Sequence, residues 1–215
     1  MIISLTFFAG ATFAFALTMN LVRKNTTLVT MYLFQSLVVV AALYSIGFSH
    51  REIGLLSAGI LTLIVKGIIA PVFLFQLIKK YSAHFSAASQ LNTPLSLLCL
   101  TATTLFAFSF VAPRLASFST LPSIPLLFAA IFATLFLMFN RRGALAAVVA
   151  ILSLENGIVL ISALLGAEHS FALEFAIAFD IAVWIVISVG FLTMMHRQFG
   201  ELDSDVRSMA HLTEE

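Results

Sequence analysis

The stretch Ala144–Leu165, ALAAVVAILSLENGIVLISALL, is a continuous apolar run with a carboxylic acid, Glu155, near its middle. At 1.5 Å per residue, a helix of this length crosses the roughly 30 Å hydrocarbon core of a bilayer. Because backbone polar groups must be bonded internally in lipid, such a run is predicted to be a membrane-spanning helix. The run decides the fold class, and its buried acid raises the question of function.

The rest of the chain has the same apolar character. Of its 215 residues, 61% are hydrophobic and 10% are charged, and the mean hydropathy is +1.09. Soluble domains carry roughly 25% charged residues. The net charge of +1 gives no indication of nucleic-acid binding, and the single Cys99 excludes an intrachain disulfide and a four-thiolate metal site built by this chain alone.

We therefore predict an all-α, polytopic membrane protein of about seven transmembrane helices. The predicted spans are residues 2–21, 27–48, 55–78, 94–111, 121–139, 144–165 and 171–195. No Lys or Arg precedes the first span and no small-residue cleavage site follows a short apolar run, so this span is expected to be retained. Pro71 is expected to kink the third span.

Basic residues predict the orientation of these spans. The loops after spans one, three and five, together with the tail, hold eight of them, and the opposite side holds two, Arg51 and Arg114. Because basic loops remain in the cytoplasm, the N-terminus is expected outside and the C-terminus inside the cell. The eight are Arg23, Lys24, Lys79, Lys80, Arg141, Arg142, Arg197 and Arg207.

A faint internal repeat suggests the domain organisation. Residues 1–80 form a predicted N-terminal three-helix unit, residues 81–120 a connector with the fourth span, and residues 121–198 a second three-helix unit. Residues 199–215 form a predicted cytoplasmic tail. Spans one and five share one orientation, so the repeat is expected to be parallel.

Ionisable residues inside the spans are the candidate functional residues. Counting from the span ends places Lys66, Glu155 and Asp180 near the bilayer midplane, where a charge costs roughly 2.5–3.5 kcal/mol on the mildest scale. Such groups act in proton relays, since burial brings carboxyl proton exchange towards neutral pH. The alternative for all three is a structural ion pair or a helix-packing hydrogen bond.

Other polar side chains are assigned supporting parts. Glu174 lies about one turn inside its span and is able to reach the interface, while Asn156, Ser162 and Gln35 are candidate relay or supporting side chains. The five histidines lie in loops or the tail without helical pairing, so no metal site is expected. No phosphate loop or nucleophile elbow is present, so the chain is expected not to be an enzyme on its own.

Several segments, in this order and spacing, resemble the E component of hydrogenase-4. The resemblance runs along nearly the whole chain and is carried by FQSLV (34–38), VKGIIAP (65–71), NRRGALAAVVAILSLENG (140–157), FD (179–180) and HRQFGELD (196–203). The last three spans also look like the small K component of respiratory complex I and the small C component of multisubunit cation/proton antiporters. Glu155 matches the first functional glutamate of the K component. Asp180 falls where the second is expected, but it is Asp, and Glu155 follows its basic turn by one more helical turn than in the K component.

This resemblance implies a membrane subunit of a complex I-like, group 4 hydrogenase complex such as formate hydrogenlyase, in a bacterial or archaeal inner membrane. Its partners would be large antiporter-like membrane subunits. The NiFe centre and Fe–S clusters would belong to partner subunits, and this chain would hold no cofactor. Two alternatives stay open: a subunit of a cation/proton antiporter or ion-coupled uptake complex without redox partners, and a structural spacer. The transported ion is either H⁺ or Na⁺.

Overall fold

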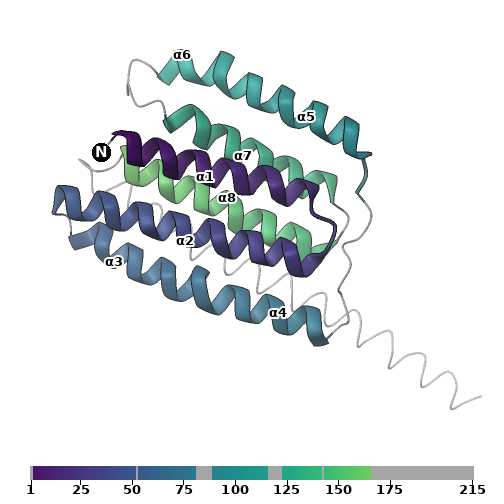
Figure 1. Ribbon diagram of the computed structural model, residues 1–215, viewed down its shortest axis with the longest axis horizontal. Coiled ribbons are helices and arrows are strands. Elements are labelled where there is room, and N and C mark those ends of the chain that lie inside the picture. Colours follow the sequence, from purple (N-terminus) through teal and green to yellow (C-terminus); the bar gives the residue numbers. More distant parts are fainter. Residues whose placement is uncertain (1, 52, 81–88, 116–122, 142, 166–215) are drawn as a thin grey trace, which may run out of the picture. The chain divides into compact units, whose positions relative to one another are not determined.

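A computed structural model describes residues 2–51, 53–80, 89–115, 123–141 and 143–165 of the protein (Figure 1). All of them belong to the first of two units into which the chain divides, Met1–Ile177, and the second unit is Ala178–Glu215. The predicted seventh span (171–195), with Glu174 and Asp180, and the predicted tail (199–215) lie outside the described residues.

Helices and their short connections account for the described residues, which form no β-strand. The first two helices are α1 (Ile2–Leu21) and α2 (Asn25–His50). The third runs without a break through α3 (Ile53–Thr62), η1 (Leu63–Ile69) and α4 (Ala70–Lys80). The fourth comprises α5 (Thr93–Phe106), η2 (Ala107–Val111) and α6 (Ala112–Leu115), and α7 (Ser123–Asn140) and α8 (Ala144–Leu165) follow.

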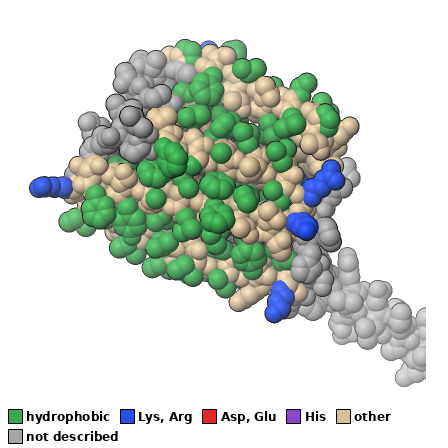
Figure 2. Space-filling view, viewed as in Figure 1, with side chains coloured by type: hydrophobic (Ala, Val, Ile, Leu, Met, Phe, Trp, Pro, Cys, Tyr) green, Lys and Arg blue, Asp and Glu red, His purple; other side chains and the backbone are tan. Residues whose placement is uncertain are grey.

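By length and composition, five of the described helices are able to cross a membrane. They are α2, the third helix, the fourth helix, α7 and α8, and residues Leu5–Leu21 add a shorter apolar helix. Hydrophobic side chains cover much of the face in Figure 2, while Lys and Arg lie near its edges. The structure thus confirms an all-α protein of the membrane type.

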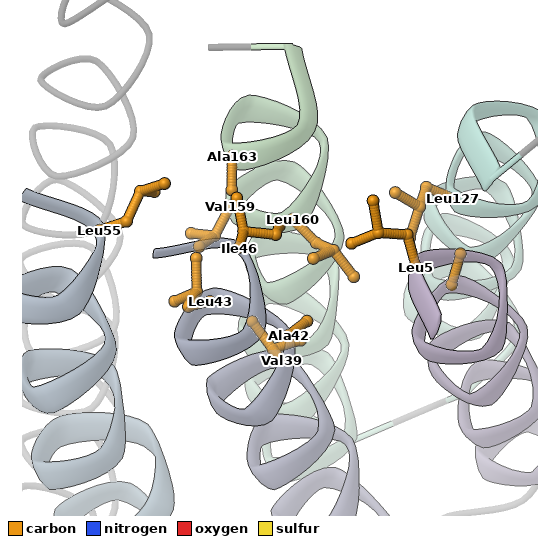
Figure 3. Close-up of a cluster of buried hydrophobic side chains, with 11 residues drawn as sticks. Leu5, Val39, Ala42, Leu43, Ile46, Leu55, Leu127, Val159, Leu160 and Ala163 are labelled. Carbon is orange, nitrogen blue, oxygen red and sulfur yellow. The ribbon is translucent and has the colours of Figure 1, made fainter. Parts of the chain in front are cut away.

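Four helices form the centre of this arrangement. Helix α1 packs against α2 and α7, and α8 packs against the same two helices; the third helix lies against α2, and the fourth against α7 (Figure 1). Towards the end where α1 begins, buried side chains from five helices make an apolar cluster (Figure 3). It includes Leu5, Ile46, Leu55, Leu127 and Leu160.

At the other end of the helices, Arg141 joins the carboxyl ends of α1 and α7. Its guanidinium Nη2 donates to the backbone carbonyls of Asn20, at 2.9 Å, and Val22. The side-chain amide of Asn20 donates to the carbonyl of Ala133 on α7 at 2.9 Å. Burial, and next the positive charge of Arg23, lower the pKa of the Arg141 guanidinium below its usual value. The carboxyl ends of α1 and α7 therefore lie together, and the two helices run parallel.

Asn140 brings the segment before the fourth helix to the same end. Its backbone carbonyl accepts from the Gln90 N–H at 2.8 Å, and its side-chain oxygen accepts from the Leu91 N–H at 3.0 Å. Its side-chain nitrogen donates to Ser96 Oγ at 3.1 Å. The connections that follow α1 and α7, and the residues that precede α5, thus share one end of the described helices.

The end of the fourth helix differs most from the predicted span bounds. The predicted span ends at Val111, but the helix continues through Pro113 to Leu115. Proline lacks an N–H and clashes with the carbonyl four residues earlier. The wider π spacing of η2, which ends two residues before Pro113, accommodates both effects. Helix α2 also extends beyond residue 48, and Arg51 ends it with a φ of 56° in the left-handed region.

Candidate functional site: a buried ion pair between two helices

Lys66 and Glu155, which the sequence places at similar depth in two separate spans, meet inside the protein. Lys66 Nζ on η1 lies 3.3 Å from Glu155 Oε1 on α8, and neither side chain has any solvent exposure. The Lys66 side chain reaches α8 from a helix whose main packing partner is α2. Both charges are therefore neutralised locally, which a pair withdrawn from water requires.

The backbone around Lys66 is a π-helix. In η1 the Ala70 N–H donates to the carbonyl of Val65, five residues earlier. Pro71 follows directly, and it has no N–H to offer the carbonyl of Gly67. The distortion that Pro71 predicts therefore takes the form of a widened turn with Lys66 at its centre. Segments of this kind frequently mark functional sites.

Beside the ion pair, uncharged polar side chains connect α8 through α2 to α1. The Asn156 amide donates to Ser36 Oγ at 2.9 Å and more weakly to Gln35 Oε1 at 3.5 Å. Gln35 Nε2 in turn donates to the backbone carbonyl of Thr12 at 3.3 Å. The side chains of all four residues are fully buried. Together with Lys66 and Glu155 they form a row of polar groups across the middle of the helices.

The structure places the predicted site residues as follows. It brings together Lys66, Glu155, Asn156 and Gln35, and it places Ser162 half-buried further along α8. Asp180 and Glu174 lie outside the described residues. Among the residues that the structure describes, no group of three or more His, Cys, Asp or Glu is arranged to hold a metal ion.

The sequence analysis named neither Thr12 nor Ser153 as a site residue, and Ser36 entered it only within the segment FQSLV (34–38). Ser36 was detectable as a polar residue in an apolar span. Thr12 contributes a backbone carbonyl to the row, and every residue carries one, so no side-chain signal marks it. Ser153 lies one turn before Asn156 and is also buried, at 1% exposure.

The fold and this site define an all-α membrane-type protein with a buried ion pair linking two of its helices. No protein-family model matches the chain, and no solved structure matches it. The uncharacterized protein Rv0085 of Mycobacterium tuberculosis is 30% identical to it over 163 residues, which make up 74% of each protein. The chain belongs to the same family as this mycobacterial protein.

Proposed function

We propose that the protein is a membrane subunit of a complex I-like, group 4 hydrogenase complex and contributes Glu155 to proton translocation coupled to electron transfer. One observation carries the proposal: an acid and a base are fully buried in contact, at 3.3 Å, in the middle of membrane-type helices. Intramembrane ionisable residues are costly, and they commonly mark ion pathways. The resemblance to hydrogenase-4 component E supports the proposal that the protein assembles with redox subunits.

The ion pair suits the transfer of a proton by electrostatic coupling. In a low-dielectric interior the two charges interact strongly, so a change in the charge of one group shifts the protonation equilibrium of the other. A charge that arrives beside Lys66 would therefore shift the protonation equilibrium of Glu155. A change in the protonation of Glu155 would in turn shift the binding of that charge. In this proposal Glu155 is a relay carboxylate and Lys66 modulates it.

The remaining parts of the proposal rest on the resemblance. Asp180 is the second relay carboxylate, and Glu174 and Ser162 are supporting polar residues. The NiFe centre and Fe–S clusters belong to partner subunits, which include large antiporter-like membrane subunits. The N-terminus faces the outside and the C-terminus the cytoplasm of a bacterial or archaeal cell.

The test is the Glu155→Gln substitution in the assembled complex. Gln keeps the size of the side chain but carries no exchangeable acid, so we expect proton translocation per electron to be lost while the complex still assembles. The control is Lys79→Met, which removes an exposed charge at the end of α4 and should leave the ratio unchanged. A wild-type ratio of protons to electrons in the Glu155→Gln complex would refute the relay assignment. Co-purification in mild detergent then shows whether a hydrogenase large subunit is bound.

A further inference from the structure

The hydrogen bonds around Gln35 determine which way the Asn156 amide points. The Thr12 carbonyl only accepts hydrogen bonds, so the NH₂ group of Gln35 must face it. The Gln35 oxygen then faces Asn156, which must present its own NH₂ group in return. Both bonds of Asn156, to Gln35 and Ser36, therefore use its nitrogen.

This arrangement leaves the Asn156 amide oxygen directed elsewhere. No described residue donates a hydrogen bond to Asn156 Oδ1, although the side chain has no solvent exposure. Ser153 Oγ also has no hydrogen-bond partner within the described part of the chain, and Ser153 is only 1% exposed. Buried polar atoms in native proteins are almost always hydrogen-bonded, to protein or to ordered water.

We propose that Asn156 and Ser153 hold a buried water molecule on the flank of α8 that faces α2. Residues three apart on a helix have Cβ atoms about 5–6 Å apart. One water spans that gap with two hydrogen bonds of about 2.8 Å. Ser36 Oγ, which accepts from Asn156, keeps its own O–H to donate and supplies the third partner that buried waters usually have.

The water completes the polar row between α8 and α2 on a different side of α8 from the ion pair. Glu155 contacts Lys66 of the third helix. It is one residue from Asn156 and two from Ser153, and helical residues at these spacings do not face each other, so the water is not a direct partner of the Glu155 carboxyl. Asn156, Gln35 and Ser36 are positioning residues that orient the water. The water site does not rest on the proposed function.

The water site is tested in the full chain, reconstituted in lipid nanodiscs and labelled with ¹⁵N only at asparagine. The chain has five asparagines, so its side-chain NH₂ signals are few, and the Asn156→Gln variant identifies the one from Asn156. We expect a magnetisation-transfer cross peak from bound water to the Asn156 NH₂ group. Ser153→Ala should abolish it. The matched control, Thr134→Val, removes a buried hydroxyl that bonds to the Ile131 carbonyl of its own helix and should leave the cross peak intact.

The outcomes separate the water site from the proposed function. Absence of the cross peak in the unmodified chain, or its persistence in Ser153→Ala, overturns the water site without bearing on Glu155. Proton translocation per electron in Glu155→Gln tests the proposed function by itself and does not bear on the water site.

Discussion

At the scale of single residues, the Lys66–Glu155 pair dominates the physical chemistry of this protein. Each side chain is fully buried, so each depends on the other for compensation of its charge. A buried pair of this kind is weak evidence for stability, because its desolvation costs about as much as the attraction gains. Removing one member is different, since the remaining charge keeps its desolvation cost.

Lys66→Met is therefore predicted to lower the free energy of unfolding by roughly 3–5 kcal/mol. The double variant Lys66→Met, Glu155→Leu should recover most of that loss, because both charges are then replaced by apolar groups of similar size. Unfolding in detergent micelles measures both values. Equal stability of Lys66→Met and the unmodified protein would show that the two charges do not depend on one another. In the assembled complex, translocation should be absent in the double variant, which lacks Glu155.

At the scale of elements, each of the two π-helical segments among the described residues is followed by a proline. Segment η1 ends at Ile69 before Pro71, and η2 ends at Val111 before Pro113. In each case a missing N–H and a steric clash oppose α-helical spacing over the preceding turn. Only η1 carries an ionisable residue at its centre. The position of Lys66 around its helix axis thus depends on the local geometry that Pro71 favours.

Pro71→Ala is predicted to weaken the ion pair without touching either charge. Alanine supplies an N–H that Pro71 cannot offer to the Gly67 carbonyl, so α-helical spacing becomes favourable and turns Lys66 around the axis. A double-mutant cycle between Lys66→Met and Glu155→Leu measures the coupling energy, which should fall when Pro71→Ala is added. The matched control is Pro113→Ala, which alters η2 and should preserve the coupling. An unchanged coupling in Pro71→Ala would mean that tertiary packing alone positions Lys66.

At the scale of the whole molecule, polar contacts collect at one end and in the middle. The carboxyl ends of α1 and α7 meet through Asn20 and Arg141, and Asn140 holds residues 89–91 beside them. The apolar cluster lies towards the other end, where α1 begins. This arrangement assigns the turn after α1 and the turn after α2 to opposite ends of the helices.

Accessibility to a membrane-impermeant maleimide tests this assignment. In a Cys99→Ala background, Arg51→Cys should react in intact cells, because the turn after α2 is predicted to face outside. Lys24→Cys, in the turn after α1, should react only after lysis. Both native side chains are exposed, so burial does not limit either reaction. Reaction of both cysteines in intact cells would contradict the predicted topology, and the reverse pattern would invert it.

The sequence by itself determined the helical class, the approximate bounds of the described helices and the similar depth of Lys66 and Glu155. These properties follow from run length, rise per residue and the cost of unbonded backbone in lipid, which are local quantities. The sequence did not determine that Lys66 contacts Glu155, nor that Asn156 turns its nitrogen towards Gln35 and Ser36. Helices that are apolar on all sides carry little periodic signal about which face meets which neighbour. Only side-chain packing in the tertiary structure decides that choice, and with it the chemistry of the site.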